Sequence, residues 1–511
     1  MKMDYRLSIE LDDREILDRI HMQESAIREF LQVYEPKSTI FSWLDTLRAI
    51  EECINLLMAD WSAVEGAFFS DLLLTPVNRF LSDPTYLIAV RERMAAKFNA
   101  NFAARFGNLI VQCFAIRHSF ALHGIHGATE GLANIGSMIG YFQSRRRHLV
   151  AMLHLMPHVC RGNKPFAPLD TLNVVLPLVE LYALPMSGCQ TVLNVRAARE
   201  KLGLSDGTNE ELAMLSPLFL EPERAPIVDM PITADGIEIL KSREQLRDDR
   251  LFSAAELRND IILIEAAYAE FDLSASDFPP CSKLIRKLST DYIDRDFWIA
   301  ITPPDLQRLF RRYAASRALQ DAFVNKSASY THCLSTYAPM VLVGGIYRST
   351  VTLLSRFLYN WRARCLDRKK RYQIRSGFIF EHAVAAELGA QGFEVQAITR
   401  VSRAEFDVVT VKDGVIWNVQ CKNNFTHLDQ VGSDADRFAR YNRNLAKAYE
   451  NALQKEVRRE HLLKKHLGID HIQHMLVSRF PVVTDNARIL PFTRVGDFAK
   501  RAEALAREAK P

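Results

Sequence analysis

The sequence lacks the features that define several other classes of protein. Its eight cysteines include no Cys-x-x-Cys pair, which excludes a zinc ribbon and the disulfide framework of a small secreted domain. The acidic N-terminus has no apolar stretch of signal-peptide length. The longest uncharged apolar run in the C-terminal third, Thr336 to Tyr347, has 12 residues, which is too short to span a bilayer. These absences predict a cytoplasmic protein with no membrane partner.

The residues that are present predict a soluble protein of several domains. The 511 residues are 48% apolar and 25% charged, and at about 100–200 residues per domain they form two to four domains. From Trp361 to Pro511 there are 27 lysines and arginines against 18 aspartates and glutamates, a net charge of +9, whereas the preceding residues carry −5. A basic region of this kind is typical of polyanion binders, because neutralising phosphates releases counterions. A solvated helical surface can carry the same excess, so charge alone leaves both interpretations open.

Hydrophobic periodicity divides the chain into four regions, and no internal repeat or low-complexity segment crosses them. Residues 1–200 have apolar residues at three-to-four spacing and predict a helical region. Residues 201–236 are interrupted by several prolines, which predicts an irregular connection. Helical spacing resumes over 237–371 and predicts a second helical block. The pattern then changes, and 372–511 predict a separate domain that contains strands.

Two groups of residues in the helical half can be interpreted in two ways. Six of the 14 histidines fall between His118 and His158, and some are spaced so that one helix face can hold a metal ion. No flanking sequence matches a zinc motif, so we favour structural roles for these histidines. The basic run Arg145–Arg147 is expected to be a solvated helix end rather than a phosphate contact.

The C-terminal region begins with a predicted helix and continues with predicted strands. Gly377 to Leu388 have amphipathic spacing and predict a helix that ends at two glycines. Phe393 to Gln396 predict a short strand after it. The pair Asp413-Gly414 stands between two β-branched runs, which predicts a β-hairpin with a two-residue turn.

Alternation along this hairpin places three different chemical groups together. Gln420 and Lys422 share one face of the second strand with Asn418, while Cys421 is on the other face. Asp407 lies at the start of the first strand. A lysine among apolar strands needs a compensating group, because burying an unpaired charge is costly. An ion pair with Asp407 would supply one without any catalysis, so a structural pair and a catalytic site both remain open.

The order of these elements resembles the PD-(D/E)xK nuclease superfamily, and more narrowly its Mrr-like and Holliday-junction-resolvase-like restriction endonuclease branches. The resemblance covers roughly residues 375–480, about a fifth of the chain. Its motifs are a Gly-aromatic helix with a glutamate, a Gly-aromatic-Glu-Val strand, a metal-binding aspartate and a Gln-x-Lys variant of the signature. The matching residues are Gly377, Phe380, Glu381, Gly392, Phe393, Glu394, Val395, Asp407, Gln420 and Lys422.

The resemblance implies a multidomain chain, with a large, mainly α-helical N-terminal region and a C-terminal α/β restriction-endonuclease-like domain. That domain would have a central mixed sheet flanked by helices. The implied activity is phosphodiester hydrolysis with Mg²⁺ or Mn²⁺ as cofactor. Asp407, Gln420 and Glu381 would be catalytic and would bind the metal through side-chain oxygens, and Cys421 would add its backbone carbonyl. Lys422, also catalytic, would position the attacking water and offset developing charge.

The expected function is that of a DNA endonuclease in prokaryotic restriction or defence, with a sensing or regulatory role for the helical region. A homodimer is a further candidate state. One alternative is a nucleic-acid-binding module whose metal site has lapsed. Another is an RNA-cleaving nuclease, because Ser402–Asp407 replaces the glycine-rich stretch that is usual in Mrr-like proteins. The residues expected to contact nucleic acid, unless they only form an exposed linking helix, are Arg368, Lys369, Lys370, Arg371, Arg437 and Arg440.

Overall fold

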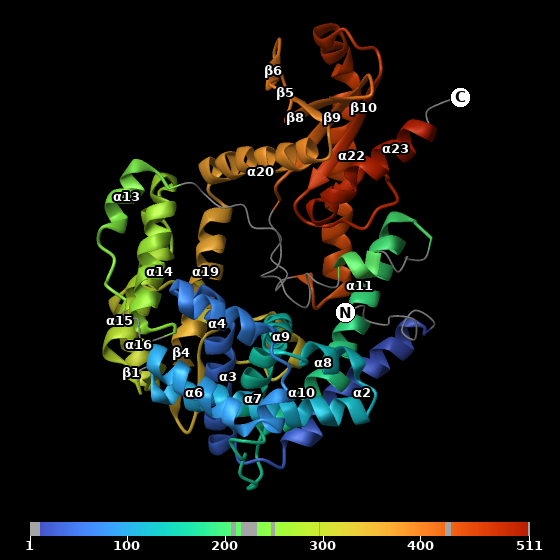
Figure 1. Cartoon of the computed structure of the whole chain (residues 1–511). Helices are drawn as coiled ribbons and strands as arrows, with labels where there is room; N and C mark the ends of the chain where they lie inside the picture. The colour runs from blue at the N-terminus through green and yellow to red at the C-terminus, as the bar shows by residue number, and fades with distance from the viewer. Residues whose placement is uncertain are drawn as a thin grey trace. The chain divides into compact units, whose positions relative to one another are not determined.

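The structure is a computed structural model of the whole chain (Figure 1). Helices predominate in the N-terminal two thirds, and a mixed β-sheet lies in the C-terminal third. The residues that the structure describes are 11–205, 211–215, 232–246, 251–295, 297–424 and 431–508.

The chain forms two compact units. The first unit contains Arg14–Cys189 and Ile232–Cys365. The second unit begins its C-terminal segment at Leu366, close to the boundary expected at residue 372, but it also recruits residues from the expected helical region and connection. Most of the expected irregular connection, 201–236, lies outside the described residues. The three segments of the second unit are Lys2–Asp13, Gln190–Pro231 and Leu366–Pro511.

The predicted helical character of the N-terminal region is confirmed. The helices as far as residue 202 are α2 (Asp13–Leu31), α3 (Pro36–Asn55), η1 (Leu56–Met58), α4 (Ala63–Leu74), α5 (Arg79–Ser82), α6 (Pro84–Lys97), α7 (Ala100–Leu122), α8 (His126–Gly131), α9 (Ile135–Val159), α10 (Thr171–Leu178), η2 (Val179–Ala183) and α11 (Leu184–Leu202). Those between residues 234 and 367 are α13 (Ala234–Leu240), α14 (Ala254–Ala267), η4 (Ala269–Phe271), η5 (Leu273–Ala275), α15 (Phe278–Asp291), α16 (Pro303–Arg312), α17 (Arg317–Phe323), α18 (Tyr330–Ser335) and α19 (Val351–Asp367).

The expected helical block over 237–371 is mainly helical, but it also contains a four-stranded antiparallel sheet that the periodicity did not indicate. Two adjacent glycines with positive φ, Gly344 and Gly345, turn the chain between its last two strands. The strands are too short for periodicity to separate them from helix. In spatial order they are β1 (Ile293–Asp294), β2 (Trp298–Ile301), β4 (Ile346–Thr350) and β3 (Val341–Val343).

The basic run Arg145–Arg147 lies in the middle of α9 and is not a solvated helix end. Arg145 Nε lies 2.7 Å from Glu180 Oε1, and Arg146 Nη2 lies 2.8 Å from Glu51 Oε2. Arg147 donates to the backbone carbonyl of Leu334. The prediction is wrong because the partners of these arginines come from distant segments, which the local sequence does not reveal. Such pairing allows charged side chains to be buried in the middle of a helix.

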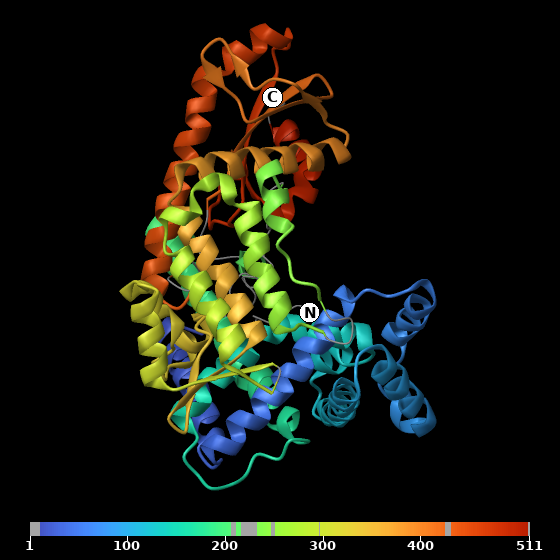
Figure 2. The ribbon, with the colours of Figure 1, turned by 90° about the vertical axis from the view of Figure 1, so that its left-hand side faces the viewer.

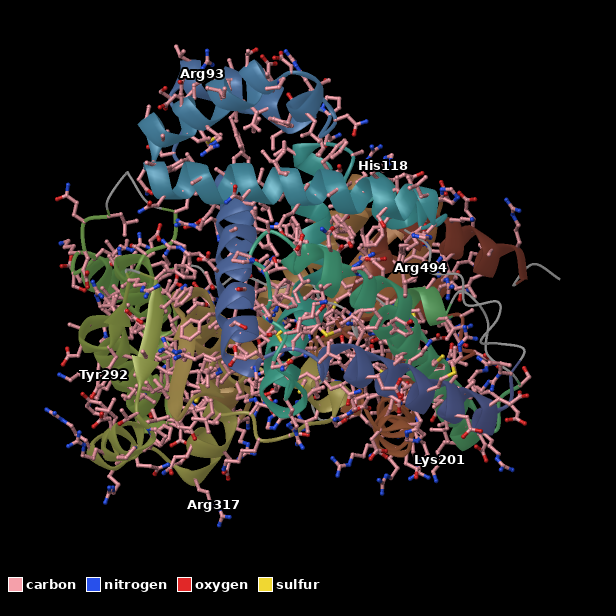
Figure 3. The ribbon with its side chains drawn as sticks, turned by 90° about the horizontal axis from the view of Figure 1, so that it is seen from below. Arg93, His118, Lys201, Tyr292, Arg317 and Arg494 are labelled. Carbon is pink, nitrogen blue, oxygen red and sulfur yellow. The ribbon has the colours of Figure 1, made fainter. Side chains whose placement is uncertain are left out.

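The histidines of this region occupy different environments. His118 lies at the surface of α7 (Figure 3), whereas His148 and His154 are buried on α9. His148 Nδ1 is 2.6 Å from the hydroxyl of Tyr330, and burial lowers the pKa of His148 to about 3. Among the described residues, no three His, Cys, Asp or Glu side chains are placed together to hold a metal ion.

One helical stretch among the described residues, Thr171–Leu202, has the length and apolar composition of a membrane span. Of the most apolar 18-residue window in this stretch, 67% is buried inside the structure. This burial is typical of a core helix.

The second unit is built around a five-stranded mixed sheet with helices on both faces (Figure 2). β10 is parallel to both of its neighbours, and the other pairs are antiparallel. In spatial order the strands are β11 (Ile489–Pro491), β10 (Ile472–Ser478), β9 (Val415–Lys422), β8 (Val408–Lys412) and β5 (Glu394–Gln396). The other elements are α20 (Lys370–Ala390), the two-stranded β6 (Arg400–Val401) and β7 (Ala404–Glu405), α22 (Ala435–Leu467), η6 (Phe492–Asp497) and α23 (Phe498–Glu508).

Strand alternation assigns the two faces of this sheet to different helices. Trp417 and Val419 of β9 pack with residues of α20 and α23 in one core cluster. Ile416, which precedes Trp417 and faces the opposite side of the sheet, packs against Leu463 of α22. The predicted helix and hairpin are both present, although α20 begins at Lys370 and not at the expected Gly377. The turn residue Asp413 has a positive φ of 51°, as a two-residue hairpin turn of type I′ requires.

Candidate active site

The β8–β9 hairpin brings Asp407 and Gln420 together. Asp407 directly precedes β8, and the pairing of Val408 with Val419 places it beside Gln420 on the next strand. Its Oδ2 atom accepts a hydrogen bond of 2.8 Å from the backbone N–H of Cys421. The strand pair therefore fixes the carboxylate against the backbone of the segment that carries the other predicted site residues.

Lys422 and Gln420 point to the same face of β9, as the alternation predicts. Lys422 Nζ donates to Gln420 Oε1 over 3.1 Å, and Gln420 is 6% exposed. Within the described part of the chain, no carboxylate lies within 4.0 Å of Lys422 Nζ. The alternative of a structural ion pair between Asp407 and Lys422 is thus not formed in this structure. The ammonium group is held instead by a neutral amide next to the carboxylate.

Glu381 reaches the same site from α20 and is half-buried. Burial, and then the charge of Asp407, raises the pKa of Glu381 from 4.5 to about 7, while Lys422 acts in the opposite direction. Burial also raises the pKa of Asp407, although the N–H of Cys421 and the charge of Lys422 oppose this. Two carboxylates that both resist ionisation form a local environment in which a cation would be stabilising.

The thiol of Cys421 points to the face of β9 opposite Gln420 and Lys422, toward α20. It packs against the core cluster that contains Val419 and Val477, and burial raises its pKa well above the ordinary value. The residue is half-buried, and the charges of Asp407 and Glu381 also raise the pKa of its thiol. A core thiol remains the interpretation we favour, and the backbone of Cys421 is the part that contacts Asp407.

We expect the stability of the metal-free protein to fall as pH rises from about 5 to 7. Glu381 prefers its protonated form in the folded state, so its contribution is complete below its unfolded pKa of 4.5 and is lost as pH rises through about 7. Thermal melts in a chelator should show this slope, and Glu381→Gln should flatten it. Glu387→Gln, an exposed change on the same helix, is the control and should leave the slope unaltered. An identical slope in Glu381→Gln would contradict the position assigned to Glu381.

Two residues at the same end of the sheet were missed by the sequence analysis. The backbone N–H of Arg479 donates to the carbonyl of Lys422 over 2.9 Å, and Arg479 Nη1 donates to Asn423 Oδ1 over 3.1 Å. Arg479 follows β10, which runs parallel to β9, so the carboxyl ends of both strands meet at one edge. The sequence does show an arginine directly after an apolar strand. It indicates a site residue only once the pairing of that strand with β9 is known.

A buried polar network lies behind the site and connects it to α22. Glu456 is fully buried, and its Oε2 accepts from Asn418 Nδ2 and from Arg459 Nε, each over 2.8 Å. The guanidinium of Arg459 lies 4.6 Å from the ring centroid of Phe406, the residue before Asp407. The network therefore joins β9 and the segment just before β8 to α22. In the sequence, Glu456 was indistinguishable from the solvated glutamates of a polar helix.

The predicted nucleic-acid contacts lie at two separate places in the second unit. Arg368 and Lys369 connect α19 to α20, and Lys370 and Arg371 form the first turn of α20. All of these side chains are exposed except Lys369, which is half-buried. At about 1.5 Å per residue, the first turn of α20 lies roughly 16 Å along the helix from Glu381.

The other two predicted contacts lie at the start of α22. Arg437 and Arg440 are both exposed there, and Arg437 Nε is 3.3 Å from Asp434 Oδ2, whose residue caps the helix. Asp434 therefore partly neutralises the positive charge at the start of α22. The structure thus brings Asp407, Gln420, Lys422, Cys421 and Glu381 together and leaves the basic residues on its surface.

Comparisons of the chain with protein-family models, with curated proteins and with solved structures find no match.

Proposed function

We propose that the second unit is a metal-dependent nuclease of the PD-(D/E)xK type, with a restriction-endonuclease-like fold, that hydrolyses phosphodiester bonds of DNA. The observation that carries this proposal is the placement of Asp407, Gln420 and Lys422 on one face of the β8–β9 hairpin, with Glu381 close enough for its pKa to be raised by Asp407. The order α20, β5, β8, β9 is also the order of elements on which the sequence resemblance rests.

The donor atoms fit Mg²⁺ or Mn²⁺. Asp407 and Glu381 offer carboxylate oxygens, and Gln420 offers an amide oxygen beside them. Mg²⁺ prefers oxygen ligands and is commonly held by one or two carboxylates while it keeps several waters. The raised pKa of both carboxylates is consistent with a site whose charge a dication would balance.

The bound metal would polarise the phosphoryl oxygen and lower the pKa of the attacking water. The hydrogen bond that the Cys421 N–H donates to Oδ2 would hold the Asp407 carboxylate in position. Lys422, held by Gln420, would donate to the oxygen on which negative charge develops. Arg479, at the same end of the sheet, would contact a neighbouring phosphate.

The basic surface supports nucleic acid as the partner, since exposed cations occur both at the start of α20 and at the start of α22. We place the protein in the cytoplasm, in restriction or defence, with the first unit sensing or regulating the second. The direct test is conversion of supercoiled plasmid by the full chain with Mg²⁺, with Mn²⁺ and with chelator. Conversion that is equal in chelator would overturn the metal-dependent activity. Binding without conversion under every condition would leave only the lapsed binding module.

Gln420→Glu should lower the Mg²⁺ concentration that cleavage requires. A carboxylate binds a hard dication more tightly than a neutral amide does, and the residue lies beside Asp407. Without metal the same variant should melt at a lower temperature, because it adds a charge at a position that is 6% exposed. Thermal melts and cleavage rates across a Mg²⁺ titration measure both effects.

The control for this variant is Gln454→Glu, which adds the same charge at an exposed position on α22. It should change neither the melting temperature nor the Mg²⁺ requirement. A Gln420→Glu protein that is destabilised and gains nothing from Mg²⁺ would remove Gln420 from the metal site.

A further inference from the structure

Helix α20 exposes two large apolar side chains beside the candidate active site. Phe378 is 52% exposed and Ile374 is 51% exposed. Phe380 and Val384 of the same helix are fully buried in the core. Phe378 precedes Glu381 by three residues, and this spacing places the two side chains next to each other on the helix surface. An exposed aromatic ring therefore lies one turn from a residue of the site.

This apolar pair lies within a positively charged stretch. Lys370, Arg371 and Arg375 are exposed on the same helix, and the segment from Lys370 to Phe380 has no acidic residue. Among the described residues, neither Lys370 nor Arg375 has a carboxylate partner. The helix surface thus combines cations that suit phosphates with a ring that suits a flat apolar group.

We propose that Phe378 is a stacking platform for an unpaired base of a nucleic acid, and that Arg375 and Lys370 hold the adjoining phosphates. The proposal rests on the proposed nuclease function and deepens it, because it assigns a substrate class with exposed bases. Every base has a π-face, so such stacking is tolerant of sequence. In an intact duplex the base faces are covered by their neighbours, so the substrate is single-stranded or contains unpaired bases.

The charge on α20 favours nucleic acid over an apolar partner for this surface. An apolar protein surface that covered Phe378 and Ile374 would also cover the exposed cations next to them. It would offer those cations no partner, and a buried charge without a partner is costly. A nucleic acid satisfies both chemistries at once through its phosphates and its bases. The aromatic ring and the cations then act on the same strand.

The test uses the full chain with Asp407→Asn, in chelator, so that binding is measured without cleavage. In this background Phe378→Trp adds a fluorophore at the proposed platform, and Phe30→Trp adds one at a residue that is 55% exposed on α2. A single-stranded oligothymidine should quench the tryptophan at 378 and leave the one at 30 unchanged. A blunt duplex of equal length should quench neither.

Phe378→Ala should weaken binding of the oligothymidine by about 5- to 100-fold and change duplex binding by less than about twofold. Phe378→Tyr should restore the affinity, because it keeps the ring. Unchanged single-strand affinity in Phe378→Ala, or an unquenched tryptophan at 378, would overturn the proposal. So would a change from dimer to monomer on Phe378→Ala, since the surface would then be an interface between two copies.

These outcomes are separable from the fate of the nuclease proposal. Stacking is read from binding in chelator, whereas the nuclease proposal is read from cleavage by the unaltered chain with Mg²⁺. Ring-dependent binding without cleavage would leave a single-strand-binding protein. Cleavage without ring-dependent binding would leave a nuclease that binds the phosphate backbone of its substrate and does not stack on its bases.

Discussion

Asp407→Asn should reduce Mg²⁺-dependent cleavage by about 10³-fold or more and leave nucleic-acid binding nearly unchanged. The change removes the main carboxylate of the proposed metal site, whose contribution to phosphoryl transfer is several kcal/mol, and each 1.36 kcal/mol corresponds to a factor of ten. The asparagine keeps an oxygen that can accept from the N–H of Cys421. Because burial raises the pKa of Asp407, removal of its charge should maintain or raise the melting temperature in chelator.

The matched control is Asp413→Asn at the turn of the same hairpin. Asp413 is exposed and has a positive φ of 51°, which asparagine tolerates well. This variant removes one negative charge from the same strand pair but lies at the end of the hairpin away from the site, so its cleavage rate should be unaltered. Near-normal cleavage by Asp407→Asn would show that the metal site has been assigned to the wrong residue.

The hairpin that carries Asp407 could be predicted because its signals are local. Asp413-Gly414 specifies a two-residue turn, and the alternation of Trp417, Asn418 and Val419 specifies which side chains share a face. Once the turn fixes the register, the position of Asp407 opposite Gln420 follows. For this reason the arrangement of Asp407, Gln420 and Lys422 could be predicted from the sequence of one hairpin, residues 407–422.

The division into units could not be predicted, because it depends on contacts between distant segments. Arg199 of α11 pairs with Asp485 over 2.9 Å, and Leu202 packs beside the cluster of Leu453 and Leu476. Asn194 donates to the carbonyl of Gly432 over 2.9 Å. Periodicity shows only that this segment is helical, and it gives no information about which core the helix joins.

The surroundings of the site were hidden for a similar reason. Glu456 and Arg459 occupy a helix of mostly polar composition, and only the fold shows that Glu456 is fully buried and bonded to Asn418. Arg479 reaches Lys422 through the parallel pairing of β9 and β10, which are separated in sequence by α22. Long-range pairing therefore determines which polar residues support the site and which are solvated.

Lys422→Met should lower the rate of cleavage by about 10²–10³-fold with little change in melting temperature. If Lys422 donates to charge that develops in the transition state, its removal should cost about as much as the loss of one oxyanion donor. Methionine keeps the unbranched apolar stem and loses only the ammonium group, whose contact in the structure is the neutral amide of Gln420. Rates under saturating substrate and thermal melts measure the two effects separately.

Lys412→Met on β8 is the opposing control, because that lysine has a structural role. Lys412 Nζ donates to the carbonyl of Gln391 over 3.0 Å and lies 4.5 Å from the ring centroid of Phe393. Its loss should lower the melting temperature and leave the rate of cleavage per folded molecule unchanged. If Lys422→Met instead behaves like Lys412→Met, with lost stability and an intact rate, Lys422 has a structural role. That result would contradict the catalytic role proposed for Lys422. The opposite responses of two lysines in one hairpin thus separate catalysis from folding.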